Sequence, residues 1–415
     1  MKSAINYTLL FSGCLLFHIA GTWSLPLIDR DEPRFAEASR EMIERSDYVV
    51  PYFNNRVRLD KPPLTYWAQT VSYRVFGEND FAARFPSAVA AAMTALLIFA
   101  WGSRLHIASA SPARIGGGNV GWWAAIIFSL SLQTFLHAKA AVADMWLVLF
   151  VTLAHWAGYE LVQRPTSNAQ HPTPNAEATK APVLRRAGDL WWWIFYAALA
   201  FGFLAKGPLG WLPLATIIST RIFLAERHLN RRFRFFRGLF FMLLIVALWG
   251  IPALVRTHGQ FFVVGIGRHV VGRSFATMEG HGANSFGMYL LLLPFYFVTI
   301  FVSFFPWSIK LPWLIRKLWR KQSAGVTAPD YSGRDKVDSY LIAGAVIIFI
   351  IFTLVKTKLP HYTLPAFPLL ALLLARRLAA ENPTHFLRNC AVASASVYLA
   401  ITLVVPPPIA RFFPA

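Results

Sequence analysis

Long apolar segments alternate with short polar connections along most of the chain. Several of these segments reach the roughly 20 apolar residues that a helix needs to cross a bilayer. The pattern therefore predicts an all-α polytopic membrane protein with about eleven transmembrane helices. Their expected ranges are 7–27, 84–104, 119–137, 143–163, 189–206, 208–225, 238–256, 286–310, 339–356, 362–380 and 389–406. Residues 1–27 also fit a signal peptide, but their length and the spans that follow favour a first transmembrane helix.

Residues 28–83 interrupt this pattern with one long polar segment between the first two predicted spans. Asp31 suits a helix N-cap, Pro33 suits the first turn, and apolar residues then recur at helical spacing. This spacing predicts an amphipathic helix that is too short to span. The stretch LTYWAQTVSYRVF predicts a second one, with Tyr and Trp at the level of the lipid headgroups. We expect both helices to lie along the membrane surface.

The chain has 415 residues, is 56% hydrophobic and carries a formal net charge of +20. That charge could indicate a nucleic-acid-binding protein, but its placement argues against one. Basic clusters such as 221–237 and 316–321 adjoin apolar spans, which is the positive-inside pattern of cytoplasmic loops. Cys14 and Cys390 both lie in apolar spans, so they indicate neither a disulfide framework nor a metal site.

Alternation of the predicted spans, starting with the amino terminus inside, assigns each loop to one side of the membrane. The 28–83 loop then faces outside and holds, with its borders, half of the chain's 20 acidic residues. Polar residues of several later loops fall on this same side. They are Asp144, Lys206, Arg268, His269, Arg273, Lys356 and Lys358.

Three carboxylates on the outer side are candidates for chemistry. Asp31 and Glu32 could cap and charge-stabilise a helix start, or one of them could act as a general base at the membrane surface. Asp144 opens a span, where an unpaired carboxylate is costly. It could pair with Lys139 or cap its helix, or it could belong to a functional site.

Cations on the outer side are candidates for binding an anion. Lys61 follows Asp60 in a Pro-bounded turn, so the two could form a weak surface ion pair or present Lys61 to a phosphate. Lys206 lies in a tight turn, where snorkelling is the alternative to a functional role. Arg268 and Arg273 offer guanidinium forks that suit phosphate, and Lys356 with Lys358 runs against the positive-inside trend.

The sequence identifies no definite cofactor. His269 with a loop carboxylate such as Asp60 could hold a divalent metal. The glycines of GIGRHVVG do not indicate a nucleotide fold, because no strand precedes them. Carboxylates and cations converging at one interface suit a lipid phosphate as leaving group, with the cations offsetting its developing charge.

The motifs DEPRFAEASREMI, LDKPPLTYW, AVADMW, AKGPLG, RHVVGR and KTKLPHYTLP occur in this order across residues 31–365. In this arrangement the chain resembles the bacterial 4-amino-4-deoxy-L-arabinose lipid A transferases and their relatives, the protein O-mannosyltransferases. These are GT-C membrane glycosyltransferases. The resemblance implies a single GT-C domain over residues 1–415, with 28–83 as the first periplasmic loop.

The resemblance also implies inverting transfer of a sugar from a polyprenyl-phosphate donor to a lipid A-like or protein acceptor. The reaction is expected on the outer face of the bacterial inner membrane, among membrane lipids and without nucleic acid. The matching motifs assign Asp31, Glu32 and Asp144 to catalysis. The expected phosphate-binding residues are Lys61, Lys206, Arg268, Arg273, Lys356 and Lys358. Arg34, Tyr66, His361 and Tyr362 are expected to line the substrates.

Several departures from the family pattern leave the sugar and the acceptor open. Asp60 stands where the aminoarabinose enzymes have Glu, and His361 stands where they usually have another residue. The chain is also expected to lack their carboxy-terminal periplasmic domain. Two other functions are weighed. A flippase for a lipid-linked anionic glycan would place ionisable residues at mid-membrane. A non-catalytic anchor would show no gathering of charge on one side.

Overall fold

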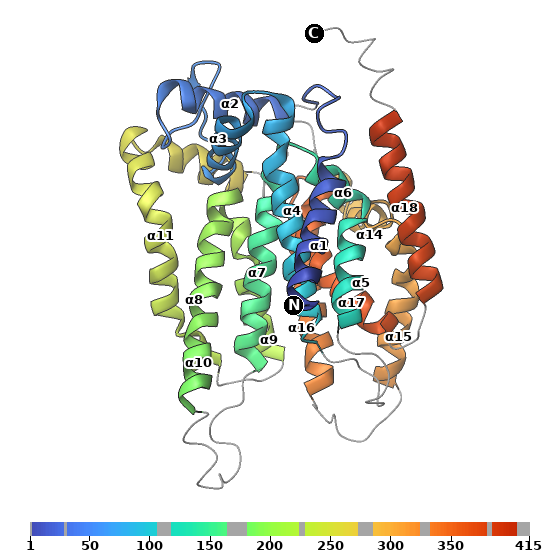
Figure 1. The fold of residues 1–415 in the computed structure, drawn as a ribbon. Helices are drawn as coiled ribbons and strands as arrows, with labels where there is room; N and C mark the ends of the chain where they lie inside the picture. Colours follow the sequence, from blue (N-terminus) through green and yellow to red (C-terminus); the bar gives the residue numbers. More distant parts are fainter. Residues whose placement is uncertain are drawn as a thin grey trace.

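The computed structural model describes residues 2–28, 31–105, 118–163, 181–223, 229–272, 285–323, 333–379 and 384–404. These residues form a helical bundle whose described part contains one two-stranded hairpin, β1 (Tyr52–Phe53) with β2 (Arg56–Val57) (Figure 1). The helices are α1 (Lys2–Ile19), α2 (Asp31–Arg45), α3 (Leu64–Phe76), α4 (Asp80–Gly102), α5 (Gly118–Ser129), α6 (Leu132–Ala138), α7 (Asp144–Gln163), α8 (Ala181–Lys206), η1 (Gly207–Trp211), α9 (Leu212–Phe223), α10 (Leu229–Phe233), α11 (Phe235–Arg256), η2 (Phe262–Gly272), α13 (Phe286–Leu291), α14 (Phe295–Ser303), η3 (Trp307–Lys310), α15 (Leu311–Ser323), α16 (Gly333–Leu354), η4 (Pro360–Ala366), α17 (Phe367–Ala379) and α18 (Thr384–Val404).

The all-α polytopic fold class is confirmed. Six described helical segments are long and apolar enough to cross a membrane, and the bent pair Val120–Ser129 and Leu132–Ala138 offers a seventh. The predicted number of about eleven stays a prediction. One continuous apolar stretch, Asp189–Ile222, covers two of the predicted spans. The predicted span 286–310 is divided among the short helices α13, α14 and η3.

The junction between α8 and η1 depends on glycines. Gly207 follows Lys206 with a φ of +68°, a left-handed conformation that glycine adopts readily. A Cβ atom added at Gly202 would lie 3.0 Å from the Cα atom of Gly210. These two residues would lie far apart in one continuous helix, so the chain folds back here and brings η1 against the end of α8.

The polar 28–83 segment covers one end of the bundle with α2 and α3 (Figure 1, blue). Both helices predicted from its sequence are confirmed. The apolar face of α2 is buried as its spacing predicts, with Phe35 and Met42 packed against the fully buried Tyr66 of α3. Trp249 of α11 donates a hydrogen bond from Nε1 to the carbonyl oxygen of Val49 at 2.9 Å, which ties the segment to the bundle.

The hairpin turns at Asn54 and Asn55, whose φ values are 51° and 62°. Asparagine tolerates this left-handed region better than most residues, and two such residues suit a two-residue hairpin loop. After β2 the chain runs directly into Arg58, Leu59 and Asp60. The hairpin thus leads into Arg58, whose guanidinium lies 5.0 Å from the ring centre of Phe35 on α2.

The core of the bundle is packed around α4. Its alanines Ala90, Ala91, Ala92 and Ala95 are fully buried. Small side chains let helices approach closely, which is the usual packing mode inside membranes. Away from α2 and α3, Asp338 of α16 pairs with Arg376 and Arg377 of α17. Asp338 thus joins α16 to α17 and offsets one of the two positive charges.

Candidate active site

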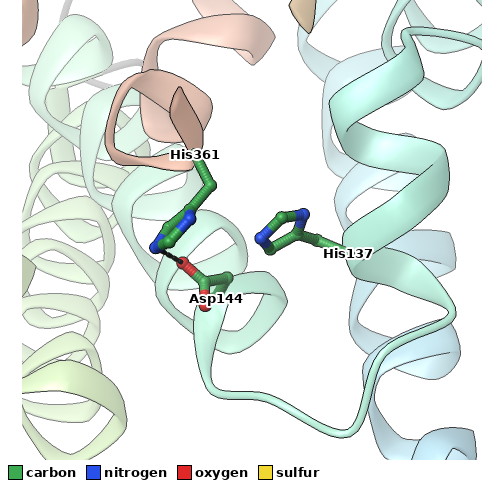
Figure 2. Close-up of side chains that lie close together, drawn as sticks. All are labelled: His137, Asp144 and His361. Atoms are coloured by element: carbon green, nitrogen blue, oxygen red, sulfur yellow. Dashed lines mark ion pairs between the residues drawn. The ribbon is translucent and has the colours of Figure 1, made fainter. Parts of the chain in front are cut away.

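An ion pair between Asp144 and Lys206 forms the centre of the candidate site. Asp144 begins α7, is 7% exposed, and accepts a hydrogen bond from Lys206 Nζ to Oδ1 at 2.6 Å. His361 of η4 brings its Nε2 to 4.0 Å from the same oxygen (Figure 2). The Lys206 ammonium also lies 5.9 Å from the ring centre of Tyr362. The structure thus brings together four residues that the sequence assigned to the site.

Lys139, the alternative partner that the sequence offered for Asp144, lies elsewhere. Its Nζ donates hydrogen bonds to the carbonyl oxygens of Phe17 and Ala20, at the end of α1. Burial lowers the pKa of Lys139 to about 8. Lys139 therefore closes the carboxyl end of α1, and among the described residues the hydrogen bond to Asp144 comes from Lys206.

A cavity of about 480 Å³ adjoins this ion pair. Lys206 belongs both to the ion pair and to the cavity wall, where it lies with Asp60 and Lys61. The rest of the wall comes mainly from apolar residues, among them Trp211, Val246, Trp249, Leu254, Phe261 and Phe262. The cavity is thus an apolar pocket with two cations at its polar end, a shape that suits an amphipathic anion.

Glu32 is buried, and both oxygens of its carboxylate accept hydrogen bonds. It is 5% exposed, and its two carboxylate oxygens accept hydrogen bonds from Arg84 Nε at 2.9 Å and Nη2 at 2.8 Å. The backbone amides of Ile28 and Ala141 also donate to it, at 2.7 and 2.8 Å. Arg84 in turn donates to three carbonyl oxygens between residues 22 and 26. These contacts join α2 to α4, and the assignment of Glu32 to catalysis stays a prediction.

Asp31 has the opposite environment, because it is exposed at the start of α2. It lies within electrostatic range of Arg58 and Tyr66. Arg58 is 7% exposed and donates to Asp60 from Nε at 2.8 Å. Arg58 Nη1 and the Tyr66 hydroxyl are buried without a hydrogen-bond partner among the described residues. The Arg58 and Tyr66 side chains interact with each other, and neither residue lines the cavity.

Lys358 contacts the helix that precedes it. Its ammonium donates to the carbonyl oxygens of Phe352 and Thr353, at the end of α16, and lies 5.6 Å from the ring centre of Tyr296. These contacts cap α16, and the assignment of Lys358 to phosphate binding stays a prediction. Lys356 is half-buried in the same connection.

Burial lowers the pKa of Lys358 to about 8, which makes the stability of the protein depend on pH. The unfolded chain binds more protons than the folded one between pH 8 and the ordinary lysine pKa near 10.4, so stability rises with pH across this window. We therefore expect wild type to gain stability relative to Lys358→Met as pH rises from about 8 to 10. Melting curves in detergent measure this difference. Parallel curves for the two proteins would contradict it.

The remaining predicted residues have varied placements. Arg34 is half-buried on α2, and Tyr66 is fully buried. Arg268 and His269 lie on η2, but their side chains are not described. Arg273 lies outside the described residues. Asp60 forms an ion pair with Arg58. The metal pair of Asp60 and His269 stays a prediction, because the side chain of His269 is not described.

Sequence reasoning missed Arg58, Arg84 and His137. Arg84 carried a usable signal, because an arginine at the beginning of a predicted span is expected to have a partner. Arg58 lies beside Asp60, but nothing in the local pattern indicates that it is buried. His137 approaches Asp144 only through the bend between α6 and α7 (Figure 2).

Comparisons with known proteins agree with this fold. The family model described as dolichyl-phosphate-mannose-protein mannosyltransferase matches residues 60–169. An undecaprenyl phosphate-alpha-4-amino-4-deoxy-L-arabinose arabinosyl transferase from Edwardsiella ictaluri is 28% identical over 393 residues, covering 92% of this chain and 61% of the relative. A protein of the same name from Aeromonas salmonicida is 29% identical, covering 87% of this chain and 58% of the relative.

Among solved structures, the crystal structure of ArnT from Cupriavidus metallidurans bound to undecaprenyl phosphate superimposes with a TM-score of 0.69. The match covers 98% of this chain and 71% of that one, at 20% identity. The resemblance to GT-C membrane glycosyltransferases that the sequence predicts is thereby confirmed. The chain spans about 60% of the length of these curated relatives.

Proposed function

On the premise of this family resemblance, we propose that the chain transfers a sugar from a polyprenyl-phosphate carrier to an acceptor. The observation that carries the proposal is the apolar cavity, whose polar end holds Lys61 and Lys206 beside the buried Asp144. A polyprenyl phosphate has the matching chemistry, because it joins a long apolar chain to an anionic head. The similar arabinosyl transferases are named for such a carrier.

The cavity offers separate contacts for the two parts of the donor, its isoprenoid chain and its phosphate. Its apolar walls, from α8, η1, α11 and η2, would remove isoprenoid surface from lipid or water. Lys61 and Lys206 would meet the phosphate. A lysine ammonium has three donors, so Lys206 can keep its bond to Asp144 and still donate to a phosphate oxygen. Asp144 would thereby fix the direction of the Lys206 side chain.

The proposed step is a displacement at the anomeric carbon of the sugar. The acceptor oxygen forms the new bond from the face opposite the carrier, the bond to the phosphate oxygen breaks, and polyprenyl phosphate leaves. Negative charge then grows on the phosphate, where Lys61 and Lys206 stabilise it, with Arg268 and Arg273 as further candidates. If the acceptor is a hydroxyl, the Asp31 carboxylate takes its proton. An acceptor phosphate is already anionic and needs no base.

Glu32 and Lys358 have structural roles in this proposal. Glu32 holds α2 against α4 through Arg84, so that Asp31 stays at the edge of the site. Tyr66 stays among the proposed substrate-lining residues, beside Arg58, which holds the cavity-lining Asp60. Arg34, His361 and Tyr362 line the same region.

The acceptor is proposed to be a lipid A-like molecule or a protein, met on the outer face of the bacterial inner membrane. Transfer is favoured over transport of a lipid-linked glycan, because the similar proteins are named as transferases. The described ionisable residues of the site also gather where α7 begins and α8 ends, and not along a path between two half-bundles.

Substitution of Gly250 tests the cavity as the donor site. Gly250 lines the cavity on α11, and a Cβ atom added there meets nothing within 4 Å. A leucine would occupy space that otherwise takes about two methylene groups of the carrier, each worth ~0.8 kcal/mol. We therefore expect Gly250→Leu to raise the KM for the donor about tenfold.

Gly13 on α1 provides the matched control. It is also open to a side chain, since a Cβ atom added there meets nothing within 4 Å, but it does not line the cavity. Gly13→Leu is expected to leave the KM for the donor at the wild-type value. Equal KM values in all three proteins would show that the carrier binds elsewhere.

A further inference from the structure

Two histidines converge on the Asp144 carboxylate, although Lys206 already neutralises its charge. His137 comes from the end of α6, Asp144 from the start of α7 and His361 from η4 (Figure 2). One ligand atom from each residue lies within 4.8 Å of the other two. Ion pairing of Asp144 with Lys206 does not require these imidazoles, so their position calls for another explanation.

We propose that His137, Asp144 and His361 form a binding site for a divalent transition metal ion, with Zn²⁺ as the best match. Two imidazoles and one carboxylate are a common ligand set of catalytic zinc sites, whereas Mg²⁺ and Ca²⁺ prefer sites made of oxygen atoms. Three protein ligands leave a fourth tetrahedral position open. A water molecule or a phosphate oxygen would complete the coordination.

The distances require only a small closure of the side chains. Zinc ligands at about 2.0–2.1 Å from the ion lie roughly 3.3 Å from one another in a tetrahedron. His361 Nε2 and Asp144 Oδ1 are already 4.0 Å apart. The centres of the two imidazole rings are 5.0 Å apart, with 39° between the ring planes. Rotation of the two histidine side chains would bring the three ligand atoms to coordination distance.

Gln133 orients His137 for this role. Its backbone carbonyl oxygen lies 3.2 Å from His137 Nδ1, and its side-chain amide contacts the same nitrogen at 3.0 Å. The carbonyl oxygen would accept a hydrogen bond from a protonated Nδ1, whereas the side-chain amide nitrogen would donate to an unprotonated one, so the two contacts favour opposite tautomers. A metal ion bound at Nε2 would select the tautomer in which Nδ1 donates to the carbonyl oxygen. A second hydrogen bond of this kind to the distal ring nitrogen is typical of metal-binding histidines.

Lys206 does not exclude a metal ion from the carboxylate. A carboxylate has two oxygens with about four lone-pair sites, so Asp144 can serve an ammonium and a metal ion together. A bound dication would leave the site with excess positive charge, because Lys206 and Lys61 lie nearby. That excess favours an anion in the fourth position. Lys206 also borders the cavity, so a phosphate at its polar end could supply this ligand.

Metal content of the purified protein tests the site directly, without any sugar donor. The protein in detergent is stripped with a chelator, reloaded with Zn²⁺ and analysed by mass spectrometry of the metal. We expect about one Zn²⁺ per chain. His137→Ala and His361→Ala each remove a ligand and should weaken binding by at least 10- to 100-fold. The exposed His258, which is no part of the cluster, provides the control, and His258→Asn should bind as wild type does.

Loading the wild type with Co²⁺ keeps the test decisive if a histidine variant fails to fold. Four-coordinate Co²⁺ with nitrogen and oxygen ligands absorbs strongly in the visible range, and we expect these bands at one equivalent. A wild-type protein that takes up neither Zn²⁺ nor Co²⁺ would overturn the proposal. Equal affinity in wild type, His137→Ala and His361→Ala would overturn it as well. Neither result depends on the proposed sugar transfer.

Discussion

Asp31→Asn is expected to lower sugar transfer to a hydroxyl acceptor by about 10²- to 10⁴-fold, the range that a general base contributes. Asp31 is exposed at the start of α2, so the substitution should leave folding intact. Activity in membranes and the melting temperature of the purified protein measure the two effects. A loss of less than tenfold would mean that Asp31 is not the base, as expected if the acceptor is already an anionic phosphate.

The neighbouring Glu32 provides the matched control. Unlike Asp31→Asn, the substitution Glu32→Gln is expected to destabilise the fold. All four groups that contact its carboxylate are donors, so the amide of Glu32→Gln would face them with an NH₂ group and leave Arg84 unpaired. Breaking a buried ion pair by removing one partner costs about 3–5 kcal/mol. Glu32→Gln should therefore lower the melting temperature. If Glu32→Gln folded normally but were inactive, Glu32 would take over the catalytic role.

Lys206→Met is expected to abolish transfer and to destabilise the protein by about 3–5 kcal/mol, because the buried carboxylate of Asp144 loses its partner. Adding Asp144→Asn removes the remaining charge. The double variant should regain most of the lost stability and still be inactive, since Lys61 alone is left to stabilise the charge on the phosphate. Thermal melting of the two single variants and the double variant measures the effect on stability. Transfer assays on the same variants measure the effect on activity.

Lys317 on α15 is the control for these variants, because it is an exposed lysine that does not line the cavity. Lys317→Met should change neither stability nor transfer. A double variant that transfers sugar at the wild-type rate would remove Lys206 from the phosphate site. A double variant as unstable as Lys206→Met would show that the ion pair does not account for the stability.

Features governed by local pattern could be predicted from the sequence. The amphipathic spacing after Asp31 and the stretch LTYWAQTVSYRVF predicted α2 and α3, because the period of apolar residues reports which face is buried. Alternation of the spans predicted that Asp144 and Lys206 lie on the same side, and the family resemblance added His361 to the site. The structure brings these three residues into one site.

Features governed by packing between distant segments could not be predicted. Asp31 and Glu32 are adjacent, and only the position of Arg84 on α4 decides that Glu32 is the buried one. Lys139 is nearer to Asp144 in the sequence than Lys206, yet it reaches the end of α1 instead. The division of the predicted span 286–310 into short helices could not be predicted either, because its residues are mostly apolar.

Mass spectrometry of the lipid and glycoprotein fractions from cells tests the central claim most directly. Cells carrying the wild-type protein, Asp31→Asn or no protein would be compared. The proposed function predicts a pentose-, hexose- or aminosugar-sized addition to one lipid or protein with wild type, and its loss without the protein. That addition would also identify the acceptor. Identical masses in every fraction of cells with and without the protein would contradict sugar transfer by this chain.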